Sequence, residues 1–178
     1  YFSIKENENN ILILRPLKHI SALVGELLFS LYKGLTISFY ENILHPNYIE
    51  FAIKKNNISI VGLTPTLFEK LYKNNCQLST IKHVILSGEI LSAILAKEIG
   101  QTYKHITFYN AYGMSENSPR ATIIKGKDFI DNPGSVGKPL LNTKIKIVNK
   151  EVLIKSKSIM KGYYQNKKLT KKKIIRGY

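Results

Sequence analysis

The chain has 178 residues, of which 44% are hydrophobic, so it can bury the core of one domain or slightly more. Its formal net charge is +15, but only three of its 27 Lys and Arg residues are arginines, at positions 15, 120 and 176. Arginine is the side chain best suited to bidentate contacts with bases and phosphates, so the charge predicts a solvated Lys-rich surface more than a nucleic-acid interface. The single cysteine, Cys76, excludes an internal disulfide framework. No apolar run approaches the roughly 20 residues needed to span a bilayer, and no signal peptide is visible, so we expect a cytoplasmic protein.

The first two thirds of the chain alternate short apolar runs with amphipathic segments. Strands are expected at 11–14, 35–40, 58–62, 83–87 and 106–110. Helices are expected between them at 19–33, 46–55, 65–72 and 91–99. The first of these helices places four leucines, at positions 23, 27, 28 and 31, on one apolar face. Strands that alternate with helices through short links predict an α/β fold, with a mainly parallel sheet covered by helices on both faces.

The pattern changes after residue 119. Strands without helices between them are expected at 121–124, 144–148 and 152–154, separated by turn signals at 132–134 and 137–139. This pattern predicts a small antiparallel sheet or open barrel. We therefore expect an α/β subdomain over 1–119, a small β-rich subdomain over 120–165 and a Lys-rich tail over 166–178 with a short helix.

Glycine and polar residues follow two of the expected strands, at 87–89 (Ser-Gly-Glu) and 110–116 (Asn-Ala-Tyr-Gly-Met-Ser-Glu). Ligands of open parallel sheets bind beyond the carboxyl ends of the strands. Glycine lets the backbone approach a ligand closely, and Tyr112 offers a flat face to a purine. Ser115 can donate to a phosphate oxygen, and Glu116 is a hard oxygen ligand suited to Mg²⁺. These residue types suit a nucleotide.

The segment 110–116 resembles the N-x-Y-G-x-[ST]-E signature of the adenylate-forming superfamily, which includes acyl-CoA synthetases, peptide-synthetase adenylation domains and luciferases. Five fixed residues at this spacing arise by chance roughly once in a million start positions. Further segments resemble other turns of the family in the same order: 15–19 (R-P-L-K-H), 64–67 (T-P-T-L), 87–89 (S-G-E), 133–139 (P-G-S-V-G-K-P) and 159–164 (I-M-K-G-Y-Y). The resemblance covers about residues 11–178 and implies the large domain of such an enzyme.

The resemblance implies an ATP-dependent carboxylate ligase. In this family a carboxylate attacks the α-phosphate of ATP, which gives an acyl-adenylate and pyrophosphate. A thiol of coenzyme A, or of the phosphopantetheine on an acyl or peptidyl carrier protein, then takes the acyl group. The implied ligands are therefore ATP, Mg²⁺, a small carboxylic acid and one of these thiols, without nucleic acid.

The resemblance also implies roles for single residues. Asn110 and Ala111 are expected to line the adenine, and Tyr112 to stack on it. Ser115 is expected to hold phosphate oxygens and Glu116 to bind Mg²⁺, which makes these two the catalytic candidates. The remaining expected contacts are Gly88, Glu89, Ile90, Gly113 and Met114 for the nucleotide, and His19, Ser87 and Gly88 for the acid.

The same resemblance places the family's phosphate loop before residue 1, and its ribose-binding T-G-D motif, hinge and catalytic lysine after Tyr178. We therefore expect a fragment that is inactive by itself. Three alternatives stay open: a non-catalytic nucleotide- or acyl-binding relative, a gene remnant and, on charge alone, a basic nucleic-acid-binding domain. For His19 the alternative is a capping or packing role at the start of a helix. The sequence names neither the acid nor the thiol.

Overall fold

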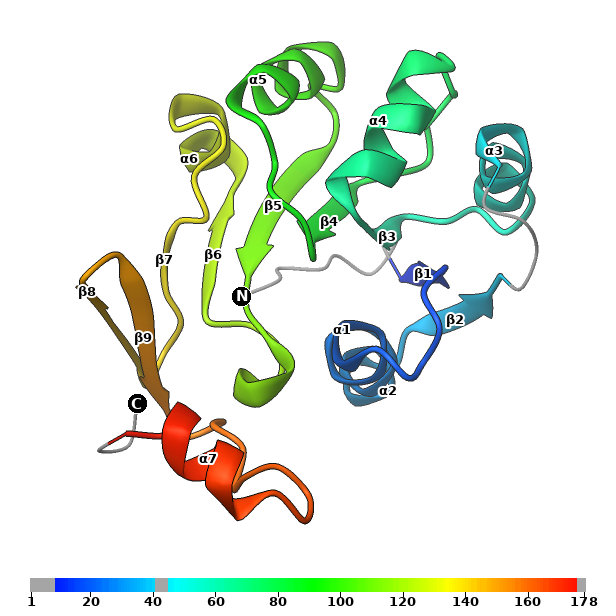
Figure 1. The fold of residues 1–178 in the computed structure, drawn as a ribbon. Coiled ribbons are helices and arrows are strands. Elements are labelled where there is room, and N and C mark those ends of the chain that lie inside the picture. Colours follow the sequence, from blue (N-terminus) through cyan, green and yellow to red (C-terminus); the bar gives the residue numbers. More distant parts are fainter. Residues whose placement is uncertain (1–8, 41–44, 176–178) are drawn as a thin grey trace.

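A computed structural model describes residues 9–40 and 45–175, which form a seven-stranded sheet and a separate hairpin (Figure 1). The strands of the sheet lie in the order β2-β1-β3-β4-β5-β6-β7. The five from β1 to β5 run parallel, β6 runs antiparallel to β5, and β7 runs antiparallel to β6. Their bounds are β1 (Asn10–Ile13), β2 (Thr36–Phe39), β3 (Ile60–Leu63), β4 (His83–Ser87), β5 (Thr107–Tyr112), β6 (Thr122–Lys125) and β7 (Lys138–Pro139). The predicted mainly parallel α/β sheet is confirmed.

Helices cover both faces of the sheet, but unequally (Figure 1). One face carries α3 (Pro46–Lys55), α4 (Pro65–Lys73), α5 (Ala93–Thr102) and α6 (Gly126–Asp131). The other face carries the consecutive segments α1 (Ile20–Ala22), η1 (Leu23–Leu28) and α2 (Phe29–Lys33). Local chemistry starts two of these helices: Pro65 follows the capping side chain of Thr64 in α4, and Ser92 caps α5. Within the described ranges, no helix is long and apolar enough to cross a membrane.

The core has two parts because successive strand residues point to opposite faces of the sheet. Val61 in β3 lies beside Val84 in β4, which lies beside Phe108 in β5, and all three belong to the large cluster under the four helices. Their neighbours along the strands form the smaller cluster on the opposite face. It consists of Ile11, Ile60, Ile85, Tyr109 and Ala111. Burial on both faces explains why these strands read as continuous apolar runs.

The first helix differs from its prediction in phase. Its residues are helical from Ile20 to Lys33, but the turns over Leu23–Leu28 are π-helical. The buried side chains are Ala22, Glu26 and Ser30, whereas Leu28 is 49% and Leu31 62% exposed. Leu23 is already 38% exposed where the π-helical turns begin, so the expected leucine face is out of phase from its first residue. The residues that face the sheet are Ala22, Glu26 and Ser30.

The part after residue 119 also differs from its prediction. The expected strands form, as β6, β8 (Thr143–Val148) and β9 (Glu151–Ser156), but β6 belongs to the main sheet and α6 follows it directly. The loop after β5, which contains a 3₁₀-helix at Ser115–Asn117, brings the chain back beside β5. Ala121 N then donates to Tyr112 O at 2.8 Å, next to the first antiparallel pair. Among the residues that the structure describes, β8 and β9 alone form a separate antiparallel sheet. Dividing the chain into subdomains at residue 119 stays a prediction.

The tail contains the expected short helix, α7 (Lys167–Lys173). The end of the predicted tail, 176–178, lies outside the described residues.

Candidate functional site

The signature segment 110–116 ends β5 and starts the loop that returns to β6. Within this loop Ser115–Asn117 form the short 3₁₀-helix η2. A Cβ atom at Gly113 would lie 1.8 Å from Pro119 O and 2.7 Å from Arg120 Cα. Glycine is therefore required here by the approach of the loop's own backbone, a reason that differs from the expected approach of a ligand.

Asn110 is 1% exposed, and its Nδ2 donates to Ser135 O at 2.8 Å. This bond ties the loop that contains the Pro-Gly-Ser-Val-Gly sequence to the carboxyl end of β5. The contact of Asn110 with adenine stays a prediction, since the structure shows this amide group holding a neighbouring loop.

Asn117, which is fully buried, holds the signature loop in place through hydrogen bonds within the loop and to the residues at the end of β9. Its Nδ2 donates to Arg120 O at 3.0 Å. Its side-chain oxygen accepts a hydrogen bond from Ser156 Oγ, and its backbone oxygen accepts one from Ser158 Oγ at 3.1 Å. The end of β9 therefore holds a loop that lies about 40 residues earlier in the chain.

Glu116 is held by the segment after β9. Tyr163 Oη donates to Glu116 Oε1 at 2.6 Å, and Met160 N donates to Glu116 O at 2.8 Å. The hydrogen bond from Tyr163 is the main cause that lowers the pKa of the Glu116 carboxyl below its ordinary value. The side chain is therefore a carboxylate at neutral pH.

An ionised carboxylate in this position fits Mg²⁺. No group of three or more His, Cys, Asp and Glu side chains gathers within 9–40 and 45–175, so the described residues contain no full cage for a metal ion. Mg²⁺ that also binds nucleotide phosphates needs only one or two protein carboxylates. Glu116 can be such a ligand if phosphates and water supply the other oxygens.

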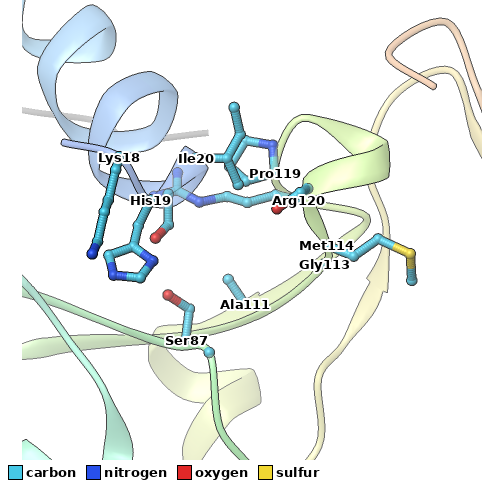
Figure 2. Close-up of a pocket in the computed structure, with 12 residues that line it drawn as sticks. Lys18, His19, Ile20, Ser87, Ala111, Gly113, Met114, Pro119 and Arg120 are labelled. Atoms are coloured by element: carbon cyan, nitrogen blue, oxygen red, sulfur yellow. The ribbon is translucent and has the colours of Figure 1, made fainter. Parts of the chain in front are cut away.

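A cavity of about 240 Å³ lies beyond the carboxyl ends of β4 and β5 (Figure 2). Lys18 and His19 point toward Ser87 from the start of α1, whereas the side chain of Met114 points away from them. The predicted residues that the structure brings together around this cavity are His19, Ser87, Gly88, Ala111, Gly113, Met114 and Ser115. The sequence did not single out the others, which are Lys18, Ile20, Ser21, Pro119 and Arg120.

A charged cluster, defined as Arg15, Glu26 and Arg120, lies beside this cavity. Arg15 forms a salt bridge with Glu26, which is 2% exposed. Nη1 of Arg15 also donates to Ser21 Oγ at 3.2 Å and to Ser87 Oγ at 3.1 Å. Arg15 therefore connects the charged cluster to two hydroxyl groups in the cavity wall.

Burial governs the ionisation of the charged cluster. It raises the pKa of Glu26, against the opposing charge and hydrogen bond of Arg15, and it lowers the pKa of Arg120. A Cβ atom at Gly62 would lie 2.3 Å from Glu26 Oε1, so β3 needs glycine there to make room for the carboxylate. The charged cluster is thus built into the sheet.

Part of the charged cluster left a signal in the sequence. Arg15 and Arg120 are two of only three arginines in a Lys-rich chain. Arg15 follows the first expected strand, and Arg120 follows the signature segment. Glu26 is the only acidic residue within 19–33. Their proximity could not be predicted, because Arg120 lies about 100 residues after Arg15.

Four predicted site residues lie outside this cavity, apart from Asn110. Glu89 Oε2 accepts a hydrogen bond from Thr66 N at 3.0 Å, so this side chain caps the first turn of α4. Ile90 is 95% exposed, and Tyr112 is half-buried. Glu116 lines a neighbouring cavity of about 210 Å³. Met114 lies between the two cavities and lines both. The roles of these residues stay predictions.

Residues 1–164 match the family model described as AMP-binding enzyme. The chain belongs to the AMP-binding enzyme family. A 2-succinylbenzoate–CoA ligase of Lactococcus lactis subsp. lactis (strain IL1403) is 28% identical to it over 171 residues, which cover 90% of this chain and 36% of that ligase. A plipastatin synthase protein of Bacillus subtilis (strain 168) is 26% identical over 154 residues, which cover 80% of this chain and 6% of that protein.

Solved structures show the same fold. The o-succinylbenzoate coenzyme A synthetase from Bacillus subtilis, in complex with ATP and magnesium ion, matches this AMP-binding chain with a TM-score of 0.85 at 23% identity. The match covers 99% of this chain and 38% of that structure. A Mycobacterium tuberculosis fatty acyl CoA synthetase matches 96% of this chain and 36% of its own, with a TM-score of 0.79 at 19% identity. The chain therefore spans about a third of the length of the ligases that it matches.

Proposed function

We propose that the protein to which this chain belongs is an ATP-dependent carboxylate-activating ligase. It joins a small carboxylic acid to AMP, releases pyrophosphate, and then transfers the acyl group to a thiol. One observation carries this proposal most: Glu116, an ionised carboxylate in the loop after β5, directly follows Ser115 in the wall of the cavity that Ser87 and His19 also line. Membership of the AMP-binding enzyme family supports the same reaction.

In the first step a carboxylate oxygen of the acid attacks the α-phosphorus of ATP, and the bond from that phosphorus to the pyrophosphate oxygen breaks. Ser115 donates a hydrogen bond to a phosphate oxygen, and Glu116 holds Mg²⁺. The metal ion, when bound, neutralises charge on the phosphates. The protein contributes mainly position and charge neutralisation, because phosphoryl-type transition states need little covalent help.

The acid is proposed to bind in the cavity between α1 and the ends of β4 and β5. Lys18 and Arg120 line it, and both are positively charged side chains that attract a carboxylate. A volume of about 240 Å³ suits a small acid. Because several relatives are 2-succinylbenzoate–CoA ligases, that dicarboxylate is the first acid to test.

In the second step the thiol attacks the acyl carbon and AMP leaves. We propose coenzyme A as the thiol, because the 2-succinylbenzoate–CoA ligases use that acceptor by name and match about 90% of this chain. A carrier protein, as implied by the match to a peptide synthetase, is the alternative. We also propose a cytoplasmic location, where ATP and coenzyme A are present.

The proposal is tested by acid-dependent exchange of labelled pyrophosphate into ATP, catalysed by the complete protein. Wild-type protein is expected to show exchange with at least one acid of a panel that includes 2-succinylbenzoate. Glu116→Ala is expected to lower this exchange by roughly 10²-fold or more, the usual effect of removing one charge-stabilising group. Glu98→Ala, at an exposed position on α5, is the matched control and keeps the wild-type rate. Full exchange in Glu116→Ala would remove Glu116 from the reaction.

A further inference from the structure

The chain after β9 reaches back to the signature loop and contacts Glu116 twice. Met160 donates from its backbone to the backbone oxygen of Glu116, and Tyr163 donates from its hydroxyl to the carboxylate. The two partners of the second bond are 47 residues apart. A backbone contact fixes where Glu116 sits, whereas the phenol contact fixes how its carboxylate is turned.

Tyr163 is itself held in place by the start of α7. The backbone N of Tyr163 donates to Thr170 Oγ1 at 2.9 Å, and this threonine hydroxyl donates in turn to Asn166 O at 2.9 Å. Asn166 in turn caps α7, because its Oδ1 accepts from Leu169 N at 3.0 Å. Gly162 fits against this arrangement, since a Cβ atom there would lie 2.8 Å from Thr170 Cγ2.

The tyrosine ring lies in a wall that is mainly apolar. The cavity of about 210 Å³ beside Glu116 is lined by Met114, Ile154, Ile159, Met160 and Tyr163, among others. The phenol hydroxyl needs a hydrogen-bond acceptor in such surroundings, and a bond to an ionised acceptor such as the Glu116 carboxylate is stronger than a bond to a neutral one. The ring packs in the cavity wall, and the hydroxyl group donates to Glu116. Substitution by phenylalanine removes the hydroxyl alone and so separates the two roles.

We propose that Tyr163 is a positioning residue for the metal ligand Glu116. Its hydroxyl holds Oε1 and so turns the carboxylate to present its other oxygen to the cation. A glutamate side chain that is already oriented loses less conformational freedom when the metal binds, so metal affinity rises. Partners that orient a metal-binding side chain typically change metal affinity by 10–100-fold. This inference rests on the proposed function, because it takes Glu116 as the Mg²⁺ ligand.

The test compares Tyr163→Phe with Tyr164→Phe in the complete protein. Tyr164 is the next residue, it is 90% exposed, and its hydroxyl accepts a hydrogen bond from Gln165 Nε2 at 3.3 Å. The measurement is the affinity for Mn²⁺, a paramagnetic probe for the Mg²⁺ site, in the presence of a non-hydrolysable ATP analogue. Tyr163→Phe is expected to weaken Mn²⁺ binding by about tenfold, and Tyr164→Phe to leave it unchanged.

Two further readouts separate positioning from a general loss of structure. In the exchange assay Tyr163→Phe is expected to raise the KM for Mg²⁺ about tenfold while kcat at saturating Mg²⁺ stays within about twofold of wild type. In a Glu116→Gln background, where Mn²⁺ binds through the analogue's phosphates, Tyr163→Phe is expected to change nothing further. An effect of Tyr163→Phe that persists in that background would show a structural role and overturn the inference.

The outcomes distinguish this inference from the proposed function. If the wild-type protein binds neither the ATP analogue nor Mn²⁺ with it, the proposed function fails. If the wild-type protein binds both and Tyr163→Phe behaves like Tyr164→Phe, the proposed function stands and the positioning role of Tyr163 is wrong.

Discussion

Arg15 forms a buried ion pair and also contacts the wall of the proposed acid site. The pair Arg15–Glu26 is buried, and Arg15 also donates to Ser87 in the wall of the proposed acid site. Taking two charges out of water is expensive, so such a pair is retained only where geometry offsets the loss of hydration. The hydrogen bond to Ser87 connects the pair to the proposed site.

Glu26→Ala is expected to destabilise the protein strongly. The substitution leaves Arg15 as a partly buried charge without its carboxylate, and breaking a buried pair in this way typically costs about 3–5 kcal/mol. Urea denaturation of the complete protein checks the change in the free energy of unfolding. The control is Glu69→Ala, which removes an exposed pair with Lys73 on α4 and is expected to have little effect. Equal small effects in both variants would show that the Arg15–Glu26 pair does not support the fold.

The elements were predictable where local chemistry decides them. Pro65 after Thr64, and Ser92 before α5, are start signals that can be read from the sequence, and both helices begin where these signals stand. The short elements α6 and β7 were missed, because six and two residues are too few for a periodic pattern. The phase of the first helix was wrong because two of the three residues on its buried face, Glu26 and Ser30, are polar, and hydrophobic spacing does not select them.

The cap of α4 supplies a pH-dependent contribution to stability. Hydrogen bonds that Glu89 accepts from the side chain and from the backbone N–H of Thr66 lower the pKa of Glu89 below its ordinary value of 4.5. The folded state then binds the proton of Glu89 less tightly than the unfolded state does. The contribution is therefore complete above the ordinary pKa and is lost as pH falls through the lowered value.

Glu89→Gln is expected to lower stability slightly at pH 7, by about 0.5 kcal/mol, the low end for a lost helix cap, because the side chain is exposed. The difference from wild type is expected to shrink as pH falls below the ordinary pKa of 4.5 and the wild-type carboxylate is protonated. Thermal unfolding followed at several pH values checks this. A difference that does not change with pH would contradict the capping role of the charge.

At the scale of the whole molecule, the proposed site is assembled from distant parts of the chain. The signature segment was predicted from its residues and from the family resemblance, and the structure places it at the end of β5 as expected. Its supports could not be predicted. Ser156, Ser158 and Tyr163 reach the signature loop from 39 to 47 residues away, and local pattern says nothing about such contacts.

The same limit applies to the sheet. A run such as 121–124 identifies a strand but not its neighbour, so β6 was expected in a separate small sheet and instead pairs with β5. This placement has a consequence for the site. Because β6 returns beside β5, Pro119 and Arg120 close over Gly113 and complete the wall of the cavity.

The central claim is that Glu116 binds the metal ion of Mg·ATP beside the acid cavity, and a crystal structure of the complete protein with Mg²⁺ and a non-hydrolysable ATP analogue tests it most directly. We expect a metal ion about 2.0–2.1 Å from a carboxylate oxygen of Glu116, with the hydroxyl of Tyr163 still bonded to the other oxygen and the α-phosphate facing Ser87 and His19. A nucleotide bound elsewhere, or a metal ion held without Glu116, would contradict the claim.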